Sequence, residues 1–438
     1  MRLRWACFSS KRKLRVSLAC GIDFGTSNSS AGFVQVGAPV LVKVEGDSTS
    51  IPSAIFCPAF GGNICFGGRA IESYVEGENG RLFRAIKSIL GSSLINETTV
   101  AGGRRTKFTS ILGSFLGHIK KTTEDQAGGP IENAVLGRPV FFVDGDPAAD
   151  RIAQDQLMRV AHAQGFKHIE FQYEPIAAAL DYEHSVEREE IALIADIGGG
   201  TSDFSIVRVS AERRNRADRK QDILAYSGVH VGGTDLDYRL SLKQVMPHFG
   251  YQTPQKKRPE LDLPNSYFHE LAQWHRIAFL YTHKMEADLK HLRAIAAEPE
   301  RVGRFLRVVH ERAGHKVAGE TENAKIRLSD DEYATMDLSY IDEGLVIGTS
   351  RALFEETVRA ECAKIAACVD ECMRRAGIRA DAIDAVFLTG GSTSTPAVER
   401  ACLLHTPGAK IVRGNKFASV GMGLAIDSAL KFGEGSRR

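Results

Sequence analysis

Two short stretches of the sequence carry the side chains best suited to chemistry. In Gly21–Ser30 and again in Ile194–Ser205, an apolar run ends in an aspartate and leads into glycine, threonine and serine. Glycines let backbone N–H groups approach an anion closely, and hydroxyl groups add further donors, so each stretch predicts a phosphate cradle. For either stretch taken alone, a Gly-rich β-turn without a ligand is the alternative.

The aspartate in each stretch adds a metal ion to this prediction. Asp23 and Asp196 would repel phosphate unless a cation lay between them, and carboxylate oxygens are ligands that Mg²⁺ prefers. The two aspartates are 173 residues apart, which is too long for a solenoid repeat and is typical of a duplicated domain. The sequence therefore predicts a magnesium nucleotide held between two lobes.

The segments around the cradles predict a mixed α/β fold in which each cradle joins the two strands of a hairpin. Asp146 and Pro147 predict the N-cap and first turn of a helix between the two copies. A long amphipathic helix is predicted over Ser350–Ala376. The buried strand predicted at Asp384–Thr389 leads into a third Gly-rich turn, Gly390–Thr393.

The stretch 241–320 is interpreted as a helical insertion, because it shows few strand patterns and is rich in charged residues. The apolar residues with helical spacing in this stretch are Leu271, Trp274, Ala278 and Tyr281.

Composition excludes several classes of protein. A chain of 438 residues exceeds what one hydrophobic core usually supports, which favours two lobes. With 56 basic against 54 acidic residues, the chain has no large net charge that would attract nucleic acid or an acidic membrane. No apolar run reaches the roughly 18 residues that span a bilayer. We therefore expect no nucleic-acid or membrane partner.

The eight cysteines are sparse, form no zinc-type pair and predict reduced, mostly buried thiols in a cytoplasmic protein. Residues 1–15 are interpreted as a basic extension. Leu18–Gly21 resembles a lipoprotein cleavage site, but the apolar stretch before Cys20 is too short for an export signal.

The sequence resembles the ATPase domain of the DnaK-type heat-shock chaperones, within the actin and sugar-kinase fold superfamily, and more narrowly the short bacterial YegD-type relatives of DnaK. The resemblance covers nearly the whole chain, from about residue 16 to residue 430. It rests on the motifs Gly21–Ser29, Ala85–Gly91, Glu174–Ala179, Asp196–Asp203, Val231–Asp237, Glu322–Ser329, Ser350–Glu355 and Gly390–Thr393.

The resemblance implies a two-lobed actin-like ATPase fold of duplicated ribonuclease-H-like domains, with a helical insertion in the second lobe. We expect the lobes at 16–190 and 191–430, the insertion at about 241–320, and a tail at 431–438. The insertion lies where nucleotide-exchange factors dock in the family. We also expect the chain to lack the family's interdomain linker and peptide-binding β-sandwich.

The resemblance also implies a site for ATP or ADP with Mg²⁺. Asp23 and Asp196 would hold the metal, mainly through water. Lys87, Glu174, Asp196 and Thr201 would be catalytic, with Lys87 contacting the γ-phosphate and the attacking water. The residues implied to bind the nucleotide are Asp23, Gly25, Thr26, Ser27, Asn28, Gly198, Gly199, Gly200, Thr201, Gly232, Gly233, Glu322, Lys325, Ser329, Gly390, Gly391 and Ser392.

Two further pairs of residues bear on this site. Pro139 and Arg151 match the family's proline switch and its arginine, which couple the bound nucleotide to movement of the lobes. Ile326 and Ser394 stand where the family has two arginines that sandwich the adenine, so adenine preference rests on other contacts.

The resulting hypothesis is a slowly hydrolysing ATPase switch related to DnaK that acts with a protein partner or client not identified by the sequence. Two alternatives of different class stay open. One is a small-molecule kinase of the same fold, which would need an extra base opposite the γ-phosphate. The other is a nucleotide-dependent protein that forms filaments or serves as a scaffold.

Overall fold

The computed structural model describes residues 18–433 except 144, 184–185, 214–215, 217 and 415–418. The predicted basic extension, 1–15, and the last five residues of the predicted tail lie outside the described residues. Every helix in the described part of the chain is too short or too polar to cross a membrane.

The first lobe is built on a sheet with the strand order β11-β10-β1-β2-β3, and a short strand, β4, also pairs with β2. β1 and β2 form an antiparallel hairpin, whereas β10 runs parallel to β1 and β11 runs parallel to β10. The strands are β1 (Ala19–Phe24), β2 (Asn28–Gln35), β3 (Ala38–Leu41), β4 (Ile51–Pro52), β10 (Asn133–Arg138) and β11 (His168–Tyr173).

The second lobe repeats this arrangement in a sheet with the order β14-β13-β12-β19-β20. Again an antiparallel hairpin, β12 with β13, is followed by two parallel strands on the side of its first strand. The repeated topology confirms the duplicated fold that the paired motifs predicted. The strands are β12 (Glu190–Ile197), β13 (Ser202–Val209), β14 (Ile223–Val229), β19 (Ala385–Thr389) and β20 (Lys410–Arg413).

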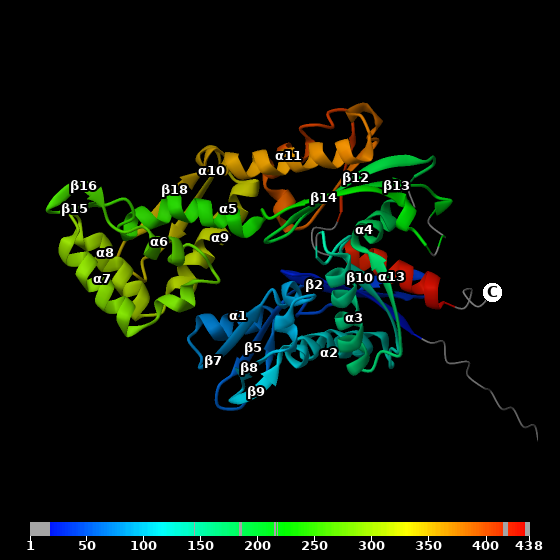
Figure 1. Cartoon of the computed structure of the whole chain (residues 1–438), viewed down its shortest axis with the longest axis horizontal. Helices are drawn as coiled ribbons and strands as arrows, with labels where there is room; N and C mark the ends of the chain where they lie inside the picture. Colours follow the sequence, from blue (N-terminus) through cyan, green and yellow to red (C-terminus); the bar gives the residue numbers. More distant parts are fainter. Residues whose placement is uncertain are drawn as a thin grey trace, which may run out of the picture.

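Two helices, α4 (Glu174–Tyr182) and α13 (Ser419–Phe432), pack against each other between the two sheets (Figure 1). Their side chains share one buried core with residues of both sheets, including Val135 and Ile194. A Cβ added to Gly423 of α13 would lie 1.8 Å from the carbonyl oxygen of Ala177, so the close contact of these helices requires glycine. Both helices therefore join the lobes.

The rest of the first lobe covers and extends its sheet. Asp146 caps α3, because its carboxylate accepts hydrogen bonds from the backbone N–H groups of Ala148 and Ala149, as the sequence predicted. The elements are α1 (Gly67–Val75), α2 (Phe108–Ala127), α3 (Pro147–Ala163), β5 (Ala54–Pro58), β6 (Cys65–Phe66), β7 (Gly80–Arg84), β8 (Thr98–Ala101) and β9 (Arg104–Lys107).

The rest of the second lobe is mostly helical. The helix predicted over Ser350–Ala376 is present as α10 and α11, which are separated at Val358 and end at Gly377 with φ +65°. The elements outside the insertion are α5 (Gly233–Leu240), α9 (Gly314–Asp330), α10 (Arg351–Thr357), α11 (Arg359–Ala376), α12 (Pro396–Leu403), β17 (Tyr333–Asp337) and β18 (Val346–Ser350).

The stretch 241–320 is less regular than its apolar spacing predicted. The expected helix through Trp274 is broken, because α6 ends at Leu271 and only a short 3-10 helix, Ile277–Leu280, follows. Figure 1 shows most of these elements at one end of the molecule, away from both sheets. They are β15 (Pro254–Gln255), β16 (Arg258–Asp262), α6 (Ser266–Leu271), α7 (His283–Ile295) and α8 (Pro299–His310).

Candidate functional site in the cleft between the lobes

The two predicted cradles are the turns of the two central hairpins, and they meet between the lobes. The first joins β1 to β2, and the second, 198–201, joins β12 to β13 and is closed by a 2.9 Å hydrogen bond from the N–H of Gly198 to the carbonyl of Thr201. A Cβ at Gly199 would lie 2.4 Å from Oγ of Ser27. The hairpins thus bring two Gly-rich turns from opposite lobes against each other.

Acidic side chains gather beneath these turns around one lysine. Nζ of Lys87 donates to Oε1 of Glu174 at 2.7 Å, and both side chains are largely buried. Burial raises the pKa of Asp23 to about 8, with Glu174 and Asp196 adding to the shift and Lys87 opposing it. Burial likewise raises the pKa of Asp196 to about 7, and the neighbouring Asp203 and Glu174 add to it.

The charge balance of this cluster fits a divalent cation. Burial alone would lower the pKa of Lys87, but Glu174 and Asp23 more than offset this, so the ammonium group stays charged. One ammonium group faces several carboxylates, whose oxygens are the ligand type that Mg²⁺ prefers. Among the described residues, no group of three or more His, Cys, Asp or Glu side chains is arranged to hold a metal ion by itself.

Residues from three other parts of the second lobe surround the cradle at 198–201. The N–H of Gly233 and Oγ of Ser392 both donate to the carbonyl of Gly198, at 3.0 and 3.1 Å. Nζ of Lys325 donates to the carbonyl of Gly233 at 3.4 Å and to Asp237 at 2.9 Å. The structure therefore brings together residues 198, 232–233, 325 and 392, all of which the sequence predicted to bind the nucleotide.

Two glycines of this group leave no room for a side chain. A Cβ at Gly232 would lie 2.5 Å from the carbonyl carbon of Gly199. Gly390 has φ +84°, and its Cβ would lie 2.7 Å from Oδ1 of Asp196. The neighbouring Gly391 opens a short 3-10 turn.

The remaining predicted residues differ in their exposure to solvent. Thr26, Gly200, Thr201 and Glu322 are exposed, whereas Gly25 and Asn28 are half-buried within the first hairpin. Ser329 lies one turn beyond Lys325 on α9, where its carbonyl accepts a hydrogen bond from Arg351. Ile326 is 54% exposed on the same helix.

Arg138, the last residue of β10, lies next to Pro139, and the predicted coupling role of Arg151 stays a prediction. Arg151 is exposed in the first turns of α3. Arg138 donates to the carbonyl of Pro139 at 3.0 Å, pairs with Asp150 at 2.9 Å and lies over the Tyr173 ring at 5.1 Å. Arg138 and the backbone N–H of Phe142, which donates to Asp150 at 2.6 Å, therefore both link this loop to α3.

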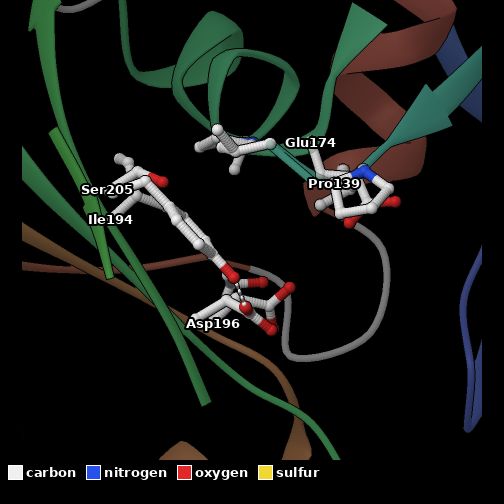
Figure 2. A pocket seen from close by; sticks show the side chains of 12 residues that line it. Pro139, Glu174, Ile194, Asp196 and Ser205 are labelled. Carbon is white, nitrogen blue, oxygen red and sulfur yellow. Dashed lines mark hydrogen bonds between the residues drawn. The ribbon is translucent and has the colours of Figure 1, made fainter. Parts of the chain in front are cut away.

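One acidic residue of the cluster had no role assigned from the sequence, although it belongs to the second motif. Asp203 lies opposite Asp196 in the β12–β13 hairpin, and Oη of Tyr226 donates to its Oδ1 at 2.5 Å. These residues line a small cavity, in which Figure 2 shows Pro139 and Glu174 facing strand residues of the second lobe.

A cluster of aromatic and basic side chains forms a second contact between the lobes. We name it the clasp: Tyr74 and Arg84 from the first lobe, and Trp274 and His315 from the second. The His315 ring lies 4.8 Å from Tyr74 and 4.7 Å from Trp274, and the Arg84 guanidinium lies 4.8 Å from the Trp274 ring. Burial lowers the pKa of His315 to about 4, so this ring is neutral at pH 7.

Two similar sheets, each presenting a Gly-rich turn and an aspartate to a shared cleft, define a two-lobed actin-like ATPase fold. A family model described as Hsp70 protein matches residues 19–259 and 305–435. The chain belongs to the Hsp70 family. This confirms the fold and the DnaK-type family predicted from the sequence and agrees with the predicted ATPase class, whereas the narrower YegD-type resemblance stays a prediction.

The chain is similar to several proteins named chaperone protein DnaK. Those of Elusimicrobium minutum and Thermosipho melanesiensis are each 26% identical to this chain, over 94% and 97% of its length. That of Mycoplasmopsis agalactiae is 25% identical over 94% of the chain. The matched parts cover 58%, 61% and 59% of these relatives, so the chain spans about three fifths of their length.

Proposed function

We propose that the protein binds ATP and Mg²⁺ between its lobes and hydrolyses the ATP slowly to ADP and phosphate. The observation that carries this proposal is the meeting of two phosphate cradles, at Ser27 and Gly199, above the Lys87–Glu174 pair. Glycine-rich turns bind phosphate through backbone N–H groups, and the half-buried acids beneath them call for a cation.

Each side chain of the cluster has a proposed task. Lys87 stabilises the negative charge that develops on the transferred phosphoryl group, and Glu174 holds the Lys87 ammonium in place at 2.7 Å. Asp23 and Asp196 hold Mg²⁺, which would neutralise phosphate charge when bound. Glu174 and Asp196 also orient the attacking water, while Thr201 and the glycines of both turns bind the phosphates.

The nucleoside is assigned to the second lobe. Glu322, Lys325 and Ser329 on α9, with the turn from Gly390 to Ser392, would hold the ribose and base. Oγ of Ser394 is buried and has no hydrogen-bond partner among the described residues, so it is available to a polar base edge. We propose adenine as the base, although neither Ile326 nor Ser394 offers a stacking cation.

We further propose that this ATPase acts as a chaperone-related switch on a protein partner or client. The support is the family and the relatives named chaperone protein DnaK. Nucleotide-driven movement of the lobes around α4 and α13 would be the signal. A cytoplasmic location is proposed because the seven cysteines among the described residues are all free.

The test is titration calorimetry of ATP, ADP and GTP, with and without Mg²⁺, together with phosphate release. Lys87→Ala removes the ammonium group, and we expect ATP binding to persist while hydrolysis falls by roughly 10²–10³-fold. Lys121→Ala, which removes an exposed lysine of α2, is the matched control and should behave like the wild type. Failure of the wild type to bind any nucleoside triphosphate with Mg²⁺ would refute the proposal.

A further inference from the structure

Tyr226 lies on the inner edge of the cleft, beside the acids assigned to hydrolysis. It belongs to β14, which pairs with β13 in an antiparallel register that places Gly228 opposite Asp203. Tyr226 and Gly228 are two residues apart on one strand and so share a face of the sheet. From this position Oη of Tyr226 donates to Oδ1 of Asp203 at 2.5 Å.

The strand leaves space for this hydrogen bond. A Cβ at Gly228 would lie 2.6 Å from Oη of Tyr226 and 3.1 Å from Oδ1 of Asp203. Any other residue at 228 would therefore push the two groups apart. The φ of Gly228 is not positive, so the reason for glycine here is this contact and not the backbone conformation.

The Tyr226 ring is also held from the first lobe. Phe141, in the loop that follows Pro139, packs edge-on against it with ring centroids 5.8 Å apart. Aromatic pairs at this separation are attractive, so the ring is fixed from one side while its hydroxyl group is fixed from the other. Tyr226 thus connects the Pro139 loop of one lobe with Asp203 of the other.

The cavity beside this pair has the size of a water site, and six of its twelve lining residues carry polar side chains while the other six are apolar. About 20 Å³ of it is open to the centre of a water molecule, which is room for about one water. Carboxyl-bearing and hydroxyl-bearing residues of both lobes line it (Figure 2): Glu174, Asp196, Asp203, Ser205, Tyr226 and Thr389. A water in this cavity has enough polar neighbours to be ordered.

We propose that Tyr226 is a positioning residue for ATP hydrolysis, because it fixes the Asp203 carboxylate toward a water in this cavity. This inference rests on the function proposed above. In the reaction the water oxygen bonds to the γ-phosphorus, the bond from that phosphorus to the oxygen of the leaving ADP breaks, and one water proton passes to a carboxylate. Asp203 directs a lone pair of the water toward phosphorus, and Tyr226 prevents the carboxylate from rotating away.

The test compares the wild type with Tyr226→Phe, which keeps the ring against Phe141 and removes only the hydroxyl group. Single-turnover hydrolysis of ATP is measured together with the dissociation constants of ATP and ADP. We expect hydrolysis to slow roughly tenfold, as for loss of one hydrogen bond to a charged group, while both dissociation constants stay within about twofold. Gly228→Ala should slow hydrolysis similarly, because its methyl group separates the pair.

The matched control is Tyr182→Phe. It removes a tyrosine hydroxyl group that donates to a carboxylate, Glu190, at 2.6 Å, but at the far end of α4 from Glu174. Its hydrolysis rate should match the wild type. A control that slowed as much as Tyr226→Phe would show a general effect of losing such a bond and would overturn the inference.

Two further outcomes separate this inference from the proposed function. A wild type that hydrolyses ATP while Tyr226→Phe matches its rate within twofold, or loses nucleotide affinity in parallel, overturns the positioning role alone. A wild type that does not hydrolyse ATP refutes the proposed function and the inference together.

Discussion

Asp23→Asn should stabilise the nucleotide-free protein while preventing Mg²⁺-dependent nucleotide binding. Asp23 is half-buried beside Glu174 and Asp196, and its desolvation together with their charges raises its pKa from 3.8 to about 8. The folded state therefore binds more protons than the unfolded state between these two values. Stability is greatest below about pH 4 for this group and is lost as the pH rises toward 8. The amide of asparagine does not ionise, so the stability of the variant does not fall in this way as the pH rises.

The size of the effect follows from the two pKa values of Asp23. Between pH 5 and pH 8 the shift corresponds to about 4 kcal/mol of lost stability. We expect about half of this loss of stability, roughly 2 kcal/mol, because water reaches the acidic side chains when the cleft opens. The melting-temperature difference between the variant and the wild type should therefore grow from pH 5 to pH 8, by about 2 °C for a chain of 438 residues.

The assay is thermal unfolding followed by circular dichroism, in EDTA and without nucleotide, from pH 5 to pH 8. Asp125→Asn removes the same charge from an exposed position on α2 and controls for net charge. A variant with the same pH slope as the wild type would refute the reasoning. So would an Asp23→Asn protein that still binds ATP more tightly with Mg²⁺ than without it.

Two other predictions concern the contacts between lobes. Trp274→Ala removes the ring that Arg84 covers, so the release of a fluorescent ADP, measured by a stopped-flow chase, should accelerate roughly 3–10-fold. The control Phe279→Ala removes an exposed ring and should leave the release rate unchanged. Equal release rates for Trp274→Ala and the wild type would contradict a role of the clasp in holding the lobes together. Gly423→Ala forces a methyl group onto the carbonyl of Ala177 and should lower the free energy of unfolding, measured with denaturant, by roughly 3 kcal/mol. In the control Gly408→Ala the added methyl group meets no atom within 4 Å, so stability should not change. A Gly423→Ala protein of wild-type stability would contradict the packing of α13.

The cradles were predictable from sequence because their chemistry is local. A glycine turn, its hydroxyl groups and the preceding aspartate lie within a dozen consecutive residues, and the second copy marked the duplication. Lys87 and Glu174 were predicted from the resemblance, and the structure pairs them at 2.7 Å. The assignment of each residue to a task at the nucleotide stays a prediction.

The contacts that were not predicted depend on register and on distance along the chain. The partner of Asp203 is fixed by how β13 pairs with β14, and a shift of one residue would turn Tyr226 to the other face. Arg84 and Trp274 are 190 residues apart and lie on different lobes. Trp274 contacts Arg84 and His315 in a segment without regular helix, which local periodicity could not indicate.

The packing of α13 has a consequence for synthesis of the protein on the ribosome. The first strand contacts the last helix so closely that a Cβ at Gly21 would lie 2.1 Å from the carbonyl carbon of Leu424. At about 5–20 residues per second, roughly 20–80 s separate the translation of these two positions. Throughout that interval the nascent first lobe has one sheet face uncovered. Its folding is therefore completed only after translation of the second lobe, and the exposed face must meanwhile be kept from aggregating.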